Sequence, residues 1–189
     1  VLQRYSEVIG PSTGIVNAGS AGAGYNHITE LPDMPGFLAT AAQLGANVNV
    51  RDFFFIDGPG VNPLNNSGAV ASQYITGLMN GGMLPRACWW WSPAGAAPTI
   101  INQTPCFFTS LKISQTNLST QAQCNTAIAN AIQATKGNFI FLILNTVFPP
   151  LAYLLNACQQ SFNGVANVTP LTPGTFANLF RYINGLQQV

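Results

Sequence analysis

The chain has 189 residues, enough for one domain with a buried core of its own. Only 6% of its residues are charged, against about 25% in a typical soluble domain, and its formal net charge is +1. The six basic residues are scattered, which excludes the clustered positive charge that nucleic-acid binding requires. The exterior must therefore be covered by Asn, Gln, Ser, Thr and Gly, and a neutral surface of this kind favours association between copies.

Residues 1–30 predict a flexible amino-terminal arm. Five apolar side chains in it are spaced as on one face of a short helix: Val1, Leu2, Tyr5, Val8 and Ile9. Gly10 and Pro11 end this pattern, and the glycine-rich stretch 19–24 follows as a hinge. Because such a hinge would not hold these side chains on their own domain, we expect them to bind a neighbouring copy by adding to its sheet edge.

The next part of the chain predicts two helices with a strand between them. Asp33 is placed to cap a short helix over about 35–44. Residues 47–56 are rich in β-forming side chains and predict a strand. Ser67 is placed to cap a helix over 67–79, which the glycines after it would end.

Strand-like segments then occupy the middle of the chain, at 87–91, 99–103 and 106–114. They interrupt the alternation of strands and helices. We therefore expect them to form a small antiparallel annex around residues 86–114.

The second half alternates helix and strand more regularly. A helix is predicted to 136 after Ser119 or Thr120, a strand buried on both faces over 139–144, and a helix over 149–162. Thr172 followed by proline starts a last helix. Its predicted apolar face comprises Phe176, Leu179, Phe180 and Ile183. The pattern predicts an α/β fold, a layered sheet with flanking helices, in a single domain over 31–189.

Four cysteines make an even number, which is typical of two disulfides formed in an oxidising compartment. The competing role is metal binding, but the chain has no C-x-x-C pair and a single histidine, His27. No metal and no cofactor are predicted. Of the three possible connectivities we expect the sequential one, Cys88 with Cys106 and Cys124 with Cys158, because it closes two short loops.

Other features are typical of export. The chain starts at Val1 without a leader, as a mature secreted or cell-surface protein would after processing. An apolar run from 139 to 157 is interrupted by Pro149 and Pro150, so no membrane span is expected. Four Asn-x-Ser/Thr triplets predict glycosylation, although two or three are expected by chance in so Asn-rich a chain. They begin at Asn65, Asn102, Asn117 and Asn167.

Groups able to carry catalysis are few, and the sequence favours a role other than that of an enzyme. The best constellation places Asp57 and Asn145 at the ends of two predicted strands, where ligands gather in open α/β sheets. Asp57 is also a usual residue for organising its Asp-Gly-Pro-Gly turn. His27, in a loop, is the one side chain with an unperturbed pKa near neutrality.

Three consecutive tryptophans, Trp89, Trp90 and Trp91, follow Cys88. In a strand successive side chains alternate, so Trp90 must point away from its two neighbours. One face can be core, and the other needs a cover. That cover is the chain itself, a partner subunit or the face of a sugar ring, and we expect at least one ring to lie at an intermolecular or ligand contact.

These features predict a secreted, disulfide-linked and glycosylated structural or surface protein. We expect it to form a homo-oligomer or polymeric assembly, or to bind a cell-surface or matrix polymer. A second interpretation is a module that binds carbohydrate or an apolar ligand through Trp89–Trp91. A third is a hydrolase-like enzyme with a site near Asp57.

Overall fold

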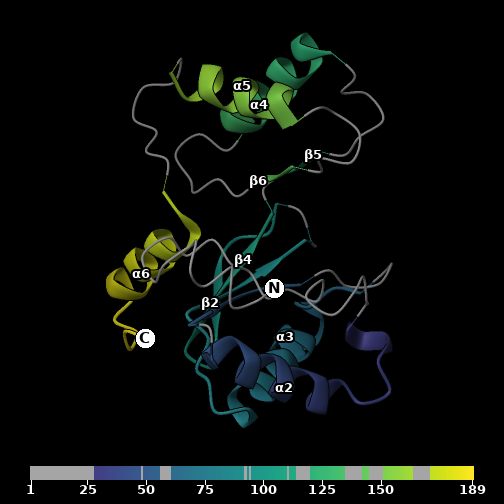
Figure 1. Cartoon of the computed structure of the whole chain (residues 1–189), viewed down its shortest axis with the longest axis vertical. Helices are drawn as coiled ribbons and strands as arrows, with labels where there is room; N and C mark the ends of the chain where they lie inside the picture. The colour runs from purple at the N-terminus through teal and green to yellow at the C-terminus, as the bar shows by residue number, and fades with distance from the viewer. Residues whose placement is uncertain are drawn as a thin grey trace. The chain divides into compact units, whose positions relative to one another are not determined.

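The structure is a computed structural model that describes residues 28–47, 49–55, 61–91, 93, 95–109, 111–113, 120–134, 142–144, 151–163 and 171–189. Within it the chain forms two compact units. One contains a four-stranded sheet with the helices around it, and the other a two-stranded sheet with two helices (Figure 1). The fold is of the α/β class, as predicted. The arm over 1–30 falls outside the described residues except for its last three, and the single domain over 31–189 stays a prediction.

The four-stranded sheet has the order β1-β2-β4-β3. Its strands are β1 (Asp52–Phe55), β2 (Ala87–Trp90), β4 (Thr104–Phe108) and β3 (Thr99–Ile101). The first three run parallel, and β3 pairs antiparallel with β4. Antiparallel pairing is therefore present in the 86–114 region, but it is confined to one hairpin within the main sheet. The tryptophan strand β2 is a central parallel strand, because its neighbours on both sides run the same way.

Two helices cover one face of this sheet. They are α2 (Met34–Asn47), which follows the 3-10 turn η1 (Ile28–Glu30), and α3 (Asn65–Asn80). Asp33 caps α2 as predicted, since its Oδ1 accepts a hydrogen bond from the Gly36 amide at 3.0 Å. The helices approach closely at Gly77, where an added Cβ would lie 2.8 Å from the Leu38 side chain.

The start of α3 differs from the prediction. Asn66, Ser67 and Gly68 all have positive φ, so Ser67 is not an N-cap in the extended conformation that a cap normally adopts. This left-handed turn brings Gly68 against the tip of the β3–β4 hairpin, where its missing Cβ leaves room for Ile101. A tertiary contact has therefore fixed the backbone where local sequence favoured a simple cap.

The opposite face of the sheet is covered by α6 (Pro173–Ile183). Thr172 caps this helix through a hydrogen bond from the Thr175 amide at 3.2 Å, and Pro173 occupies its first turn. Figure 1 shows α6 beside β2 and β4. The sheet is thus a middle layer with helices on both sides.

The second unit is built from β5 (Leu111–Ile113), α4 (Gln121–Ala134), β6 (Leu142–Leu144) and α5 (Leu151–Asn163). β5 and β6 pair in parallel, with α4 connecting them. Thr120 caps α4 in a reciprocal capping box, because its Oγ1 accepts from the Gln123 amide while Gln123 Oε1 accepts from the Thr120 amide. Within the described residues no helix combines the length and the hydropathy needed to cross a bilayer.

Candidate functional site

Trp90 lies in an aromatic cluster on the α2–α3 side of the sheet. Its ring centroid is 4.9 Å from that of Phe55, 5.8 Å from that of Phe108 and 6.2 Å from that of Tyr74 on α3. The strand register explains the cluster, since Phe55, Trp90 and Phe108 are paired across three parallel strands. Trp90 is fully buried.

Trp89 faces the other side and packs under α6. Its ring centroid is 4.4 Å from that of Phe107 and 6.3 Å from that of Phe176. Phe180 completes this second cluster at 5.0 Å from Phe107. The side chain of Trp89 is only 4% exposed.

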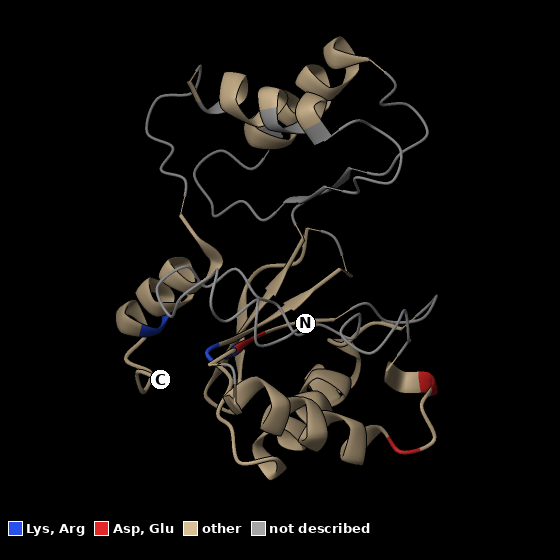
Figure 2. Ribbon diagram, in the orientation of Figure 1, with Lys and Arg blue, Asp and Glu red and all other residues tan. Residues whose placement is uncertain are grey.

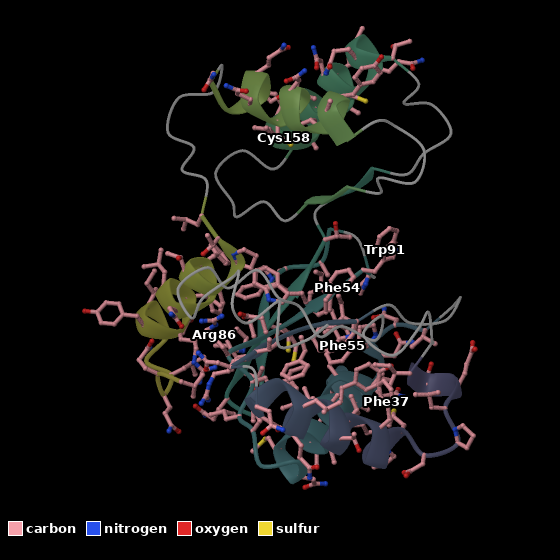
Figure 3. The ribbon with its side chains drawn as sticks, in the orientation of Figure 1. Phe37, Phe54, Phe55, Arg86, Trp91 and Cys158 are labelled. Atoms are coloured by element: carbon pink, nitrogen blue, oxygen red, sulfur yellow. The ribbon has the colours of Figure 1, made fainter. Side chains whose placement is uncertain are left out.

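The cover that the tryptophans require is therefore the chain's own helices. Trp89 and Trp90 are covered in this way, because α6 and α3 occupy the two faces on which these rings lie. The expectation that at least one of the three rings lies at an intermolecular or ligand contact stays a prediction. Trp91 is half-buried, and Figure 3 places it at the carboxyl end of β2. Of the three tryptophans, only Trp91 keeps enough exposure to contact another molecule.

Buried charge fixes α6 against the sheet. Arg86, just before β2, forms an ion pair with Asp52 at the start of β1, and its Nε donates to Asp52 Oδ2 at 2.9 Å. Gly174 lies over the Arg86 guanidinium, where an added Cβ would meet Nη2 at 2.7 Å. Arg181, one residue before Tyr182, is fully buried and donates through Nη1 to the Arg86 carbonyl at 3.1 Å.

The electrostatics of this cluster are those of a structural contact. Burial raises the pKa of Asp52, while the hydrogen bond from Arg86 and the positive charge of Arg86 oppose that shift. Burial also lowers the pKa of Arg181, whose Nε donates to the Gln187 carbonyl at 2.6 Å. Asp52 is 3% exposed and Arg86 14%, so little of the cluster is open to a ligand. Its effect is to hold the helix and the segment after it in place.

The outward side of α6 carries an exposed apolar row, which we call the α6 stripe: Leu179, Tyr182 and Ile183. Their exposed fractions are 46%, 77% and 70%. The spacings of three and four residues make them neighbours on one helix face. The predicted apolar face is therefore correct for Phe176 and Phe180 and wrong for Leu179 and Ile183.

The inward face consists instead of Gly174, Ala177 and Arg181, flanked by the two phenylalanines. The small size of Gly174 and Ala177 is the feature of the sequence that could have indicated which face of α6 is buried, and therefore which face carries the stripe. A glycine and an alanine three residues apart mark the side on which a helix approaches its neighbour closely.

Charge is almost absent from the helices. The five α-helices of the described chain contain a single charged residue, Arg181, and its side chain is buried (Figure 2). The exposed surfaces of α2, α3, α4 and α5 are thus wholly uncharged. The scarcity of charged residues noted in the sequence is therefore most complete on the outward surfaces of the α-helices.

All four cysteines lie within the described residues, and the structure has Cys88 and Cys106 as unlinked thiols. Cys88 and Cys106 are register partners on the neighbouring strands β2 and β4, and both are fully buried. Cys124 is buried on α4, and Cys158 is partly exposed on α5, the helix that packs on α4 (Figure 3). The predicted linkage of Cys124 to Cys158 stays a prediction.

Two of the four predicted glycosylation sites fall in the described residues. Asn65 is exposed at the left-handed turn that starts α3. Asn102 is exposed in the two-residue turn of the β3–β4 hairpin, where Asn102 and Gln103 both have positive φ, and its side-chain amide donates to Ser72 Oγ at 3.0 Å. Exposure makes both available for modification, and their occupancy stays a prediction.

Several predicted functional residues lie outside the described residues. They are Val1, Leu2, Tyr5, Val8 and Ile9 of the arm, the catalytic candidates His27, Asp57 and Asn145, and the triplets at Asn117 and Asn167. Among the residues that the structure does describe, no three His, Cys, Asp or Glu side chains are grouped so as to hold a metal ion.

Comparison of the chain with protein families, with curated proteins and with solved structures gives no match. The interpretation of its function therefore depends on the geometry described above.

Proposed function

We propose that this protein is a secreted structural or surface protein that associates with copies of itself, or with a cell-surface or matrix polymer, through the α6 stripe. The observation that carries this proposal is the exposure of Leu179, Tyr182 and Ile183 on one face of one helix. The buried contacts of Arg181 and Gly174 hold that helix in place, so the stripe is presented on a rigid support.

The energetics favour association at such a surface. Complete burial of a large apolar side chain is worth about 1.5–3 kcal/mol, and tyrosine is among the residues that contribute most at interfaces. Surfaces that carry no charge do not repel each other electrostatically, and the described α-helices present no charged side chain outward. Self-association is therefore the form of the proposal that we favour.

The carbohydrate-binding alternative has less support than the sequence indicated. It needed the flat faces of Trp89–Trp91, and two of these three rings are covered by the chain's own helices. Export to an oxidising compartment remains part of the proposal and is supported by the even number of cysteines and by exposed Asn65 and Asn102.

The proposal is tested by sedimentation velocity of the intact protein over a range of concentrations, with negative-stain microscopy of the same samples. We expect species larger than a monomer to increase with concentration. The variant Ile183→Asp places a charge in the stripe and should reduce association by tenfold or more, an effect of about 1.4 kcal/mol.

Gln73→Asp is the matched control, because it adds the same charge at an exposed position of another helix of the same unit, α3, away from the stripe. It should associate like the unmodified protein. Monomers at every concentration, or equal loss in both variants, would show that the α6 stripe is not an association surface.

A further inference from the structure

Cys88 and Cys106 lie opposite each other at the centre of the four-stranded sheet. They are register partners on the parallel strands β2 and β4, and their side chains therefore project from the same face. Neighbouring strands are about 4.8 Å apart, which falls within the separation of about 4.4–6.8 Å between the Cα atoms of a disulfide. The backbone thus places the two sulfur atoms for a bond without a change of register.

The surroundings of the pair determine when such a bond can form. Both residues are fully buried on the side of the sheet where α2 and α3 pack. Cys106 Sγ lies 3.5 Å from the Thr104 carbonyl, to which it donates. Burial raises the pKa of Cys106 to about 12, and burial followed by the proximity of Cys106 and Asp52 raises that of Cys88 well above its ordinary value.

A thiolate is the species that attacks a disulfide, and an oxidant must also reach it. In the folded protein neither condition is met at Cys88 or Cys106. Oxidation must therefore precede the packing of α2 and α3 onto the sheet.

We infer that Cys88 and Cys106, which are thiols in this structure, become joined during oxidative folding by a disulfide that links β2 to β4 around the β3 hairpin. The two thiols together lose two protons and two electrons as the S–S bond forms. The acceptor is a second disulfide, such as oxidised glutathione, which is reduced to two thiols through a mixed-disulfide intermediate. This inference is independent of the proposed association through α6.

The other two cysteines provide an internal comparison. Cys158 is partly exposed on α5, whereas Cys88 and Cys106 have no exposed surface. In the native reduced protein an alkylating reagent should therefore label Cys158 and leave the two sheet cysteines unmodified. This gives a measure of access that does not depend on any substitution.

The experiment compares two orders of oxidation in the intact chain. In one arm the reduced, denatured protein refolds in a buffer of reduced and oxidised glutathione. In the other it refolds with a reductant, which is then replaced by oxidised glutathione. Both products are treated with an alkylating reagent, digested without reduction and mapped by mass spectrometry.

We expect the first arm to yield a linked peptide pair containing Cys88 and Cys106, lighter by two hydrogens than the sum of the free peptides. The second arm should retain both as thiols. A first arm in which these residues remain thiols, or link to Cys124 or Cys158, would overturn the inference. Formation of the bond in the second arm at the rate of the first would overturn its order relative to folding.

A variant pair extends the test to stability. Cys124→Ala/Cys158→Ala keeps the sheet cysteines, so its unfolding midpoint in urea should still be higher after oxidative refolding than after refolding with a reductant. Cys88→Ala/Cys106→Ala removes the sheet cysteines. Its midpoint should therefore differ less between the two refolding procedures than the midpoint of the unmodified protein does. If Cys124→Ala/Cys158→Ala has the same unfolding midpoint after both refolding procedures, the sheet cysteines are not bonded, and the peptide map of the unmodified chain decides the matter should either variant not fold.

Discussion

In the unit that contains the four-stranded sheet, aromatic rings pack on both faces of the central strands. Trp90 contacts Phe55 and Phe108 on one side, and Trp89 contacts Phe107 on the other. In the second unit the helices α4 and α5 meet partly through side-chain amides. Gln121 Nε2 donates to the Tyr153 carbonyl at 2.8 Å, and Asn125 Nδ2 donates to Gln160 Oε1 at 2.7 Å.

This difference has an energetic consequence. Large buried rings contribute through the area they remove from water, and cavities left in their place are costly. Amide hydrogen bonds near the surface exchange with water, so their net contribution is about 1 kcal/mol each. Both units contain few charged residues, but they should respond differently to substitution. The aromatic core of the first unit should be sensitive to it, and the α4–α5 helix pair of the second should tolerate it better.

The largest effect is expected from Trp90→Ala. The ring is fully buried among Phe55, Tyr74 and Phe108, so its removal should lower the free energy of unfolding by about 3–5 kcal/mol. Trp91→Ala, at the half-buried position that follows the same strand, should cost less than half as much. Urea denaturation followed by circular dichroism measures both, and equal losses would contradict the assignment of Trp90 to the core.

Asp52→Ala should produce the next largest effect. It leaves the Arg86 guanidinium buried beneath Gly174 without its acidic partner, which costs about 3 kcal/mol for a buried pair. Glu30→Gln, at an exposed acidic position, serves as the control and should change stability by less than about 0.5 kcal/mol. Stability of Asp52→Ala equal to that of the control would show that the pair does not hold the sheet and α6 together.

The reduced protein should lose stability in alkaline solution. The raised pKa of Cys106, about 12, means that the folded state keeps a proton that the unfolded thiol releases near pH 9. The free energy of unfolding therefore falls as the pH rises from about 9 towards 12, by about 1.4 kcal/mol per pH unit for one thiol.

The oxidised protein is the matched control, because sulfur atoms in a disulfide do not titrate and all other groups are the same. Thermal unfolding of both forms between pH 8 and pH 11 measures the difference. Parallel curves would contradict either the burial of the thiols or the bond that we infer.

The smallest effect concerns the second unit. Gln121→Ala removes amide bonds to Asn125 and to the Tyr153 carbonyl and should destabilise α4 and α5 by about 1 kcal/mol. Gln133→Ala makes the same change at an exposed position of the same helix. Amide hydrogen exchange should be faster in α4 and α5 only in the first variant, and faster exchange in β2 would show that the units are coupled more closely than we expect.

Local signals in the sequence predicted the helices well, because a cap acts on a backbone only a few residues away. Asp33, Thr120 and Thr172 all cap the helices that they were expected to start. The exception is Ser67, where contact between Gly68 and Ile101 overrides the local preference. The strand predicted over 47–56 is shorter as β1, since Asn49 adopts a positive φ before it.

The pairing of the strands, and the choice of which helix face is buried, were harder to predict because they depend on residues that are distant in the sequence. Nothing near β2 in the sequence indicates that β1 and β4 will flank it in parallel. The burial of Arg181 likewise depends on the Pro85 and Arg86 carbonyls, more than ninety residues earlier in the chain. An arginine on an otherwise apolar helix is expected to face water, so the α6 stripe became visible only with the structure.

The most direct test of the association surface is hydroxyl-radical footprinting of the intact protein at low and at high concentration. We expect Leu179, Tyr182 and Ile183 to be oxidised rapidly in the monomer and to become protected several-fold as the protein associates, while the exposed Leu44 and Met79 of α2 and α3 keep their rates. Protection at Leu44 and Met79 with no change in the α6 stripe would contradict it.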